Sequence, residues 1–287
     1  MNQRIPIALT IAGSDSGGGA GIQADLRTFA AFGVYGASVV TALTAQNTRG
    51  VRAVHYPPPE IVVAQLDAVL EDFAVAAIKI GMLGGADIAR AVAERLSGGG
   101  EPHLTLGEGG PKGRMRAFLV YDPVMIASSG DALSGAGFVE AIADELLPLV
   151  DCLTPNLAEA AAFLGEPIAR SEADMARQGA ALMKLGPPAV LVKGGHLSGN
   201  EAVDLLVTPQ GVRRYGAPRV ASRNLHGTGC TLSSAIVANV VLGMALPEAV
   251  EAAKTFVRQA IERGRGVMLG AGAGPLIQTE LRSKGGA

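Results

Sequence analysis

The sequence predicts an α/β fold in which helices cover both faces of a mostly parallel sheet. Apolar runs of strand length alternate with helix-length segments along most of the chain, and this alternation is typical of parallel sheets. Hydrophobic residues make up 48% of the chain and charged residues only 17%, so a sizeable core can be buried. The length of 287 residues suits one undivided α/β domain. We therefore expect a single domain over residues 1–287.

The expected strands are short apolar runs bounded by glycine, proline or polar turn residues. Two late runs, Ala202–Val207 and Gly211–Tyr215, are joined by Thr208-Pro209-Gln210 and predict a hairpin. The six earlier runs are separated by segments long enough for a helical crossover, which predicts parallel neighbours. These six are Ile5–Ala12, Ser38–Ala45, Ala76–Ile80, Ala117–Tyr121, Cys152–Thr154 and Ala189–Val192.

The expected helices carry apolar residues three or four positions apart. In the first of them, Ile22, Leu26 and Phe29 fall on one face. Two long helices close the chain and follow the hairpin. The full set is Gly21–Phe32, Pro59–Glu71, Ala86–Leu96, Gly137–Leu147, Leu157–Leu164, Glu172–Leu185, Gly229–Leu242 and Pro247–Arg265.

The segment Ser97–Arg116 is unusually rich in glycine and proline. It is longer than most loops inside a compact domain. Because it joins a helix to the next strand, it belongs at the N-terminal edge of the sheet, whereas ligands bind at the opposite edge of such sheets. The sequence therefore favours a surface insertion over a lid.

The charge and composition exclude several classes of protein. The net charge is −2, the chain has no Trp, and aromatic residues make up only 4%, so neither a basic face nor a base-stacking platform for nucleic acid is expected. No apolar run approaches the ~20 residues of a membrane span. The N-terminus does not look like a signal peptide, so we expect a cytoplasmic protein in which Cys152 and Cys230 are reduced thiols.

Polar and glycine residues follow the ends of the six expected parallel strands. Because the carboxyl ends of parallel strands meet at one edge of a sheet, these residues should surround one ligand crevice. In strand order they are Gly13–Gly21, Gln46 and Asn47, Gly81 and Met82, Asp122, Asn156 and Glu159, and Lys193.

The segment Gly227-Thr228-Gly229-Cys230 precedes the first of the two closing helices. Backbone N–H groups at a helix start, made accessible by glycines, form an anion-binding site. The helix dipole is expected to lower the pKa of the Cys230 thiol there. A glycine-rich helix start with a buried structural cysteine is the alternative, and this segment alone does not decide between the two.

The glycine-rich loop Gly13–Gly21 resembles a phosphate-binding or dinucleotide-binding loop but fits neither pattern well. It lacks the Gly-Lys-Ser/Thr of a Walker A loop. Gln46 stands where a dinucleotide-binding domain has an acidic residue at the end of its second strand. The nearest carboxylate, Asp25, is either a ligand contact or a solvated acid in the first helix.

Asn156 and Glu159 fit two patterns at once. An asparagine followed three residues later by an acid is a capping box, and the same oxygen-bearing side chains suit Mg²⁺, with Asp122 assisting from the neighbouring strand. Lys193, followed by two glycines, suits a phosphate contact, although an ordinary loop lysine is the alternative. The histidines show no spacing typical of zinc sites.

Longer stretches resemble the hydroxymethylpyrimidine/phosphomethylpyrimidine kinases of the ribokinase-like superfamily. The resemblance begins with ALTIAGSDSGGGAGIQADLRTFAAFGVYGASVVTALTAQNTRG at Ala8–Gly50. It continues, in family order, with KIGML (Lys79–Leu83), YDPVM (Tyr121–Met125), TPNLAEA (Thr154–Ala160), KGGH (Lys193–His196) and HGTGCTLSSAI (His226–Ile236). It implies a three-layer α/β/α sandwich with a mostly parallel central sheet, and a homodimer.

The resemblance also implies roles for residues at matching positions. Gln46, Gly13, Asp25 and Met82 would line the aminopyrimidine pocket, where a primary amide suits a ring that both donates and accepts hydrogen bonds. The remaining roles would fall to Lys193, Lys254 and Asn156 at ATP, to Asp122, Asn156 and Glu159 at Mg²⁺, and to Gly227, Thr228, Gly229 and Cys230 at the transferring phosphate.

The function implied is ATP-dependent phosphorylation of 4-amino-5-hydroxymethyl-2-methylpyrimidine to its monophosphate and then its diphosphate, for thiamine biosynthesis. In our hypothesis the Cys230 thiolate takes the proton of the substrate hydroxyl in the first transfer. The second acceptor is a phosphomonoester with a pKa of about 6, which needs no base. Alternatives are a pyridoxal kinase on the same scaffold, a non-catalytic pyrimidine-binding protein, and a Rossmann dehydrogenase.

Overall fold

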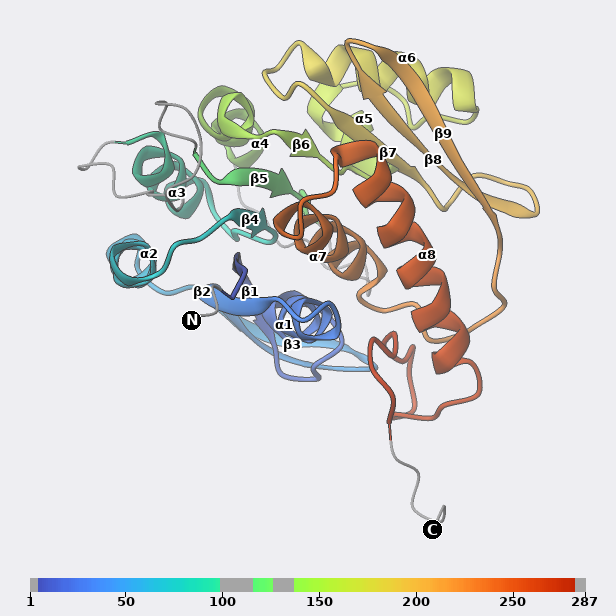
Figure 1. Ribbon diagram of the computed structural model, residues 1–287, viewed down its shortest axis with the longest axis horizontal. Helices are drawn as coiled ribbons and strands as arrows, with labels where there is room; N and C mark the ends of the chain where they lie inside the picture. Colours follow the sequence, from blue (N-terminus) through green and yellow to red (C-terminus); the bar gives the residue numbers. More distant parts are fainter. Residues whose placement is uncertain (1–4, 99–115, 126–136, 282–287) are drawn as a thin grey trace.

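The computed structural model describes residues 5–98, 116–125 and 137–281. These residues form one sheet of nine strands in the order β3-β2-β1-β4-β5-β6-β7-β8-β9. Helices lie on both faces of the sheet (Figure 1). The expected three-layer α/β/α architecture is confirmed. None of the helices in the described residues is long and apolar enough to span a membrane.

The strand pairings explain the mostly parallel character of the sheet. The five pairings from β2 through β1, β4, β5 and β6 to β7 are parallel, and those of β2 with β3, β7 with β8 and β8 with β9 are antiparallel. The β8–β9 pair is the predicted hairpin. The bounds are β1 Ile7–Asp15, β2 Tyr35–Asn47, β3 Gly50–His55, β4 Ala77–Ile80, β5 Phe118–Tyr121, β6 Cys152–Leu153, β7 Val190–Gly194, β8 Glu201–Thr208 and β9 Gly211–Pro218.

The helices divide between the two faces. One face is covered by α1 Gly21–Ala31, α7 Thr228–Val241 and α8 Leu246–Gly264. The other is covered by α2 Pro59–Asp72, α3 Ala86–Ser97, α4 Phe138–Ala141, α5 Leu157–Leu164 and α6 Glu172–Met183, with the short turns η1 Ile142–Leu146 and η2 Leu147–Leu149 after α4. In Figure 1, α7 lies close to the centre of the sheet with α8 beside it.

Two hydrophobic cores result from the alternation of side chains along each strand. In β1, Leu9 and Ile11 join the core under α2 to α6, while Ala8 joins the core under α1, α7 and α8. The same parity recurs in β4, where Ile78 and Ala77 point to opposite cores. Strands that are apolar on both faces are expected for parallel sheets covered by helices.

The structure corrects the sequence prediction in two places and leaves a third untested. Strand β3 was not predicted; the turn after Asn47 returns the chain antiparallel to β2. The expected helix Gly137–Leu147 is α4 followed by a π turn and a 3-10 turn that contains Pro148, which ends regular helix. The glycine-rich segment Ser97–Arg116 lies, except for its first two residues and its last, outside the described residues.

Gly179 of α6 provides a test of the packing between α6 and the sheet. A methyl group on Gly179 would lie 2.6 Å from Cγ2 of Val207 and 3.2 Å from Cγ2 of Val192. Alanine normally stabilises a helix relative to glycine, but here we expect Gly179→Ala to lower the free energy of unfolding by about 1–3 kcal/mol, the usual cost of overpacking. Thermal and urea denaturation measure this loss.

The matched control is Gly264→Ala at the end of α8, where the nearest atom would be 3.5 Å away. That variant should be as stable as the parent chain or more stable. Equal stability of Gly179→Ala and the parent would show that the α6 contact is loose.

Candidate functional site

The predicted ligand edge is centred on the switch point between β1 and β4. From β1 the sheet continues to β2 and β3 on one side and to β4 and β5 on the other, and this reversal leaves a crevice at the carboxyl ends. Helix α7 begins at this edge. A methyl group on Gly229, in its first turn, would lie 3.2 Å from both Oδ2 of Asp122 and Nζ of Lys193. The structure thus brings the predicted anion site and the predicted polar strand ends together.

The start of α7 has the backbone shape required of an anion site. Gly227, its N-cap, has a φ of 85°, and a methyl group there would lie 2.0 Å from the carbonyl oxygen of Gly19. Only glycine satisfies both constraints. The N–H of Thr228 donates to the carbonyl of Leu225 at 3.3 Å, whereas those of Gly229 and Cys230 have no carbonyl one turn earlier in the helix and are available to an anion. The hydroxyl of Thr228 also donates to the carbonyl of Leu225 at 2.6 Å.

Asp122, Lys193 and Glu159 form a buried charge cluster under this helix start. Nζ of Lys193 donates to Oδ1 of Asp122 at 2.5 Å and lies 3.9 Å from Oε2 of Glu159. Although burial disfavours the ammonium charge, Asp122 and Glu159 raise the pKa of Lys193 above its ordinary value. Lys193, the predicted phosphate ligand, therefore lies between Asp122 and Glu159, which are predicted metal ligands. The three residues follow or end different strands of the sheet.

Asn156 and Glu159 form the capping box at the start of α5. Oδ1 of Asn156 accepts hydrogen bonds from the backbone N–H groups of Ala158 and Glu159, both at 2.9 Å, and Oε2 of Glu159 accepts one from the backbone of Asn156 at 2.7 Å. Burial raises the pKa of Glu159 to about 7, against the opposing effect of Lys193. Because its side-chain oxygen already has two donors, Asn156 positions Glu159, and its predicted contacts with Mg²⁺ and ATP stay predictions.

Cys230 lies in the first turn of α7, but its predicted acidity is wrong. Burial raises the pKa of its thiol to about 11, and the opposing effect of Lys79 is smaller. The side chain is only 9% exposed. Loss of hydration of the thiolate thus outweighs the helix dipole, and the thiol is neutral at pH 7. Both cysteines are free and buried.

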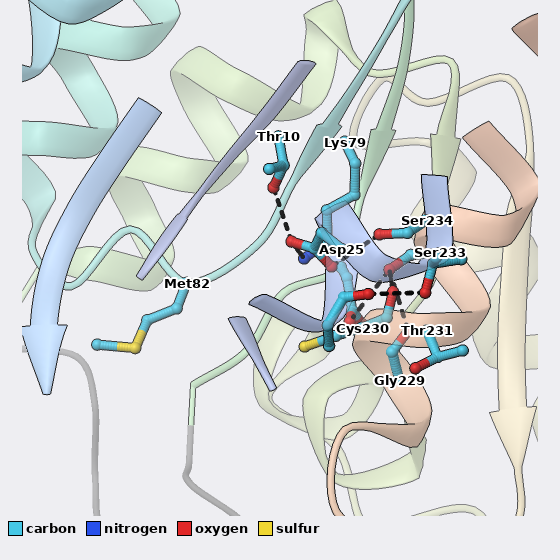
Figure 2. A network of polar contacts seen from close by, with 12 residues as sticks. Thr10, Asp25, Lys79, Met82, Gly229, Cys230, Thr231, Ser233 and Ser234 are labelled. Carbon is cyan, nitrogen blue, oxygen red and sulfur yellow. Dashed lines mark hydrogen bonds and ion pairs between the residues drawn. The ribbon is translucent and has the colours of Figure 1, made fainter. Parts of the chain in front are cut away.

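Asp25 belongs to a sealed polar network beside Cys230 (Figure 2). Its side chain is 0% exposed and pairs with Nζ of Lys79 at 2.8 Å. Hydroxyls of Thr10 and Ser234 donate to its two carboxylate oxygens, both at 2.7 Å. Although burial opposes the charge, Asp25 raises the pKa of Lys79. Asp25 is therefore not a solvated acid; it ties α1 to β1, β4 and α7, and its place in the aminopyrimidine pocket stays a prediction.

Gly13 and Met82 do lie side by side at the ends of β1 and β4. A methyl group on Gly13 would lie 3.4 Å from Sδ of Met82. Figure 2 shows the Met82 side chain set apart from the Asp25 network. Gly13 is buried and Met82 only 8% exposed, so the pair packs at the strand ends, and its place in the aminopyrimidine pocket stays a prediction.

Gln46 lies beside Asp15 and His226, two residues to which the sequence analysis gave no individual role. Nε2 of Gln46 lies 3.1 Å from Nε2 of His226, which lies 3.0 Å from Oδ2 of Asp15. Asp15 also accepts hydrogen bonds at 2.8–2.9 Å from the backbone N–H groups of Gly17, Gly19 and Ala20. The Asp-Ser-Gly-Gly-Gly sequence was the available signal, since Asp commonly accepts from the backbone two residues on.

Lys254 lies away from this cluster, on α8. Its Nζ donates to Oδ2 of Asp204 at 2.6 Å, and Oδ1 of Asp204 accepts from the backbone of Gly194, the residue after Lys193, at 3.0 Å. Lys254 also lines a hollow of about 210 Å³ between β9 and α8. The link to the phosphate site runs through Asp204 alone, so a direct ATP contact of Lys254 stays a prediction.

Comparison with known proteins identifies one family. A family model described as phosphomethylpyrimidine kinase matches residues 15–107 and 110–277. The hydroxymethylpyrimidine/phosphomethylpyrimidine kinase of Rhizobium meliloti is 53% identical over 270 residues, which cover 94% of this chain and 96% of the relative. The protein of the same name from Escherichia coli is 46% identical over 269 residues, with the same coverage.

Solved structures give the same picture. A phosphomethylpyrimidine kinase from Clostridium difficile is 42% identical with a TM-score of 0.75, and covers 90% of this chain and 100% of its own. The pyridoxal kinase of Staphylococcus aureus, solved with AMP-PCP and pyridoxal, is 30% identical with a TM-score of 0.82, and covers 96% of this chain and 94% of its own. This chain thus shares its backbone fold with a pyridoxal kinase, so the choice of substrate depends on the side chains and not on the fold.

The Lys79–Asp25 pair provides a test of the buried network. Lys79→Met would leave the Asp25 carboxylate buried without its cation, and we expect a loss of about 3–5 kcal/mol in the free energy of unfolding. The double variant Asp25→Asn/Lys79→Met removes the charge and keeps groups that can bond to Thr10 and Ser234. It should recover a large part of that loss in chemical denaturation, and a double variant no more stable than Lys79→Met would contradict the role of the charge.

Proposed function

The chain belongs to the phosphomethylpyrimidine kinase family, and we propose that it transfers phosphate from ATP first to 4-amino-5-hydroxymethyl-2-methylpyrimidine and then to the resulting monophosphate. The relatives that share most of its length carry the name of both activities. The observation that carries the proposal is the meeting of the α7 helix start with Lys193 and Asp122 at the switch point of the sheet. This places an anion site where the fold binds ligands.

Phosphoryl transfer requires mainly positioning and charge stabilisation, and this site supplies both. The N–H groups of Gly229 and Cys230 would hold the transferring phosphate, with Lys193 beside them. Lys193 remains charged because its pKa is raised by Asp122 and Glu159. When phosphate oxygens approach, its ammonium can exchange a carboxylate partner for a phosphate partner without leaving the cluster.

The residues present also suit a magnesium ion that is held mainly by water and nucleotide. Asp122 and Glu159 would supply carboxylate oxygens, and Mg²⁺ typically takes only one or two such ligands from protein in phosphate sites. In the described residues, no three His, Cys, Asp or Glu side chains are grouped for metal binding. Bound there, the ion would neutralise charge on the phosphates. Lys193 would then have to release Asp122.

The aminopyrimidine would bind at Gln46, near Gly13 and Met82. A primary amide can donate and accept at once, which matches an amino group next to a ring nitrogen. A pyridoxal kinase is the nearest alternative, because that fold is shared at a TM-score of 0.82. The lower identity, 30% against 53%, favours the pyrimidine.

We further propose that the protein is a cytoplasmic homodimer. Exposed apolar side chains lie along β2 and α2 near one end of the sheet, where Tyr35, Leu43 and Ile61 are 50–52% exposed. Exposed apolar side chains on such a surface suit a symmetric contact with a second copy. Free, buried cysteines suit a reducing compartment.

The proposed reaction is tested by an ATP-dependent assay with the aminopyrimidine, in which the mono- and diphosphate products are separated by chromatography. We expect both products, with the monophosphate appearing first. Pyridoxal is the comparison substrate, and its kcat/KM should be lower. Turnover of pyridoxal in preference to the pyrimidine would favour the alternative, and absence of turnover with either would favour a non-catalytic binding protein.

Cys230→Ala separates a catalytic base from a positioning residue. Because the thiol is neutral in this structure, we expect the variant to slow the two transfers by similar factors, below about tenfold. A pre-formed thiolate base would instead make the first transfer about 100-fold slower or more and spare the second. Single-turnover rates with the free pyrimidine and with its monophosphate decide between these outcomes. Cys152→Ala, at a buried position of β6, serves as the control for loss of a buried thiol.

A further inference from the structure

The orientation of the Gln46 amide is determined by few groups. Its backbone is fixed by Ser16, whose Oγ donates to the Gln46 carbonyl and accepts from the Gln46 N–H, both at 2.8 Å. A bulge between Ala45 and Gln46 aims the side chain out of the regular strand. The amide nitrogen lies 3.1 Å from Nε2 of His226 and the amide oxygen 3.4 Å from Oγ1 of Thr44. A half turn about the last bond of the side chain would exchange these two positions.

Asp15 determines what His226 can offer to this amide. The Asp15 carboxylate is 5% exposed and receives three backbone N–H groups, so it acts only as an acceptor. Although burial opposes ionisation, the hydrogen bond from His226 and those from Ala20 and Gly17 lower the pKa of Asp15. Nε2 of His226, at 3.0 Å, must therefore carry the hydrogen and donate it to Asp15. An N–H that donates cannot also accept from the Gln46 nitrogen, so it favours the Gln46 oxygen.

Thr44 favours the same half turn from the other side of the amide. Its hydroxyl donates to the carbonyl of Ser14 at 3.0 Å, which uses its one hydrogen. Toward Gln46 the hydroxyl can then only accept, and this requires the Gln46 nitrogen. His226 and Thr44 together thus specify one orientation, with the oxygen toward the imidazole and the nitrogen toward the hydroxyl.

We propose that Asp15 and His226 are a positioning pair that locks the Gln46 amide in this orientation and so makes the pocket specific for 4-aminopyrimidines against 4-oxopyrimidines. The inference rests on the proposed function. A 4-aminopyrimidine presents an amino donor beside a ring-nitrogen acceptor, whereas its 4-oxo counterpart presents a carbonyl acceptor beside an N–H donor. The two hydrogen-bonding edges are nearly equal in shape, but their donor and acceptor stand in opposite order. A Gln46 amide with a fixed orientation pairs with one of these edges, whereas an amide that is free to turn pairs with either.

The test compares kcat/KM for 4-amino-5-hydroxymethyl-2-methylpyrimidine with that for its 4-oxo counterpart. In the parent chain we expect strong preference for the amino compound, because a mismatched partner leaves buried polar groups unpaired. His226→Phe keeps a ring and removes the hydrogen bond, and the preference should fall at least about tenfold. A purely structural effect of His226→Phe would lower kcat/KM for the 4-amino and the 4-oxo compound equally. An unchanged ratio of these two kcat/KM values therefore overturns the proposal.

Two further variants keep the result interpretable. In a Gln46→Leu background, His226→Phe should leave the ratio unchanged; a continued fall would mean that His226 reads the substrate directly, which overturns the positioning role. Thr44→Val loses only a hydroxyl and should lower the ratio in the same direction even if His226→Phe folds poorly. Turnover of neither pyrimidine by the parent chain removes the proposed function together with this inference, whereas turnover with a ratio that no variant moves removes the inference alone.

Discussion

The close approach of α7 to the centre of the sheet is the constraint on which the site depends. All residues from Cys230 to Asn239 are buried, so the helix has no solvent-facing side. Its small residues permit this: Gly229 leaves room for Asp122 and Lys193, and Ser234 reaches Asp25. Its first turn is in turn fixed by Gly227, which meets the backbone at Gly19 where no side chain would fit. The helix start therefore lies at the switch point because of packing.

A buried ion pair and a buried cluster of one lysine with two carboxylates hold the charges of the site. Lys79 with Asp25, and Lys193 with Asp122 and Glu159, lie on either side of the α7 start. Charges so deeply buried are tolerated only when paired. Cys230 lies between these clusters, where burial keeps its thiol neutral. In the proposed reaction, the chemistry of transfer would therefore fall to backbone amides and a paired lysine, without an ionised cysteine.

The glycine-rich loop after β1 connects the two halves of the site. Asp15 folds the loop around its carboxylate, and the loop in turn supports Gly227 at the phosphate side. The same carboxylate holds His226 against Gln46 at the pyrimidine side. A loop that resembles a phosphate-binding loop in sequence therefore uses its backbone N–H groups internally, on its own aspartate.

The sequence by itself determined the layers, the mostly parallel character of the sheet and the edge at which Gly13, Met82, Asp122, Lys193 and the α7 start lie, because hydrophobic periodicity and β-α alternation are local properties. Local pattern could not determine what each side chain does there. The capping role of Asn156, the burial of Asp25 and the neutral thiol of Cys230 depend on desolvation and on partners from other elements. The Asp15–His226 contact joins residues 211 positions apart. Only the tertiary structure decided these features, since the free energy of a buried polar group depends on the atoms that surround it in space.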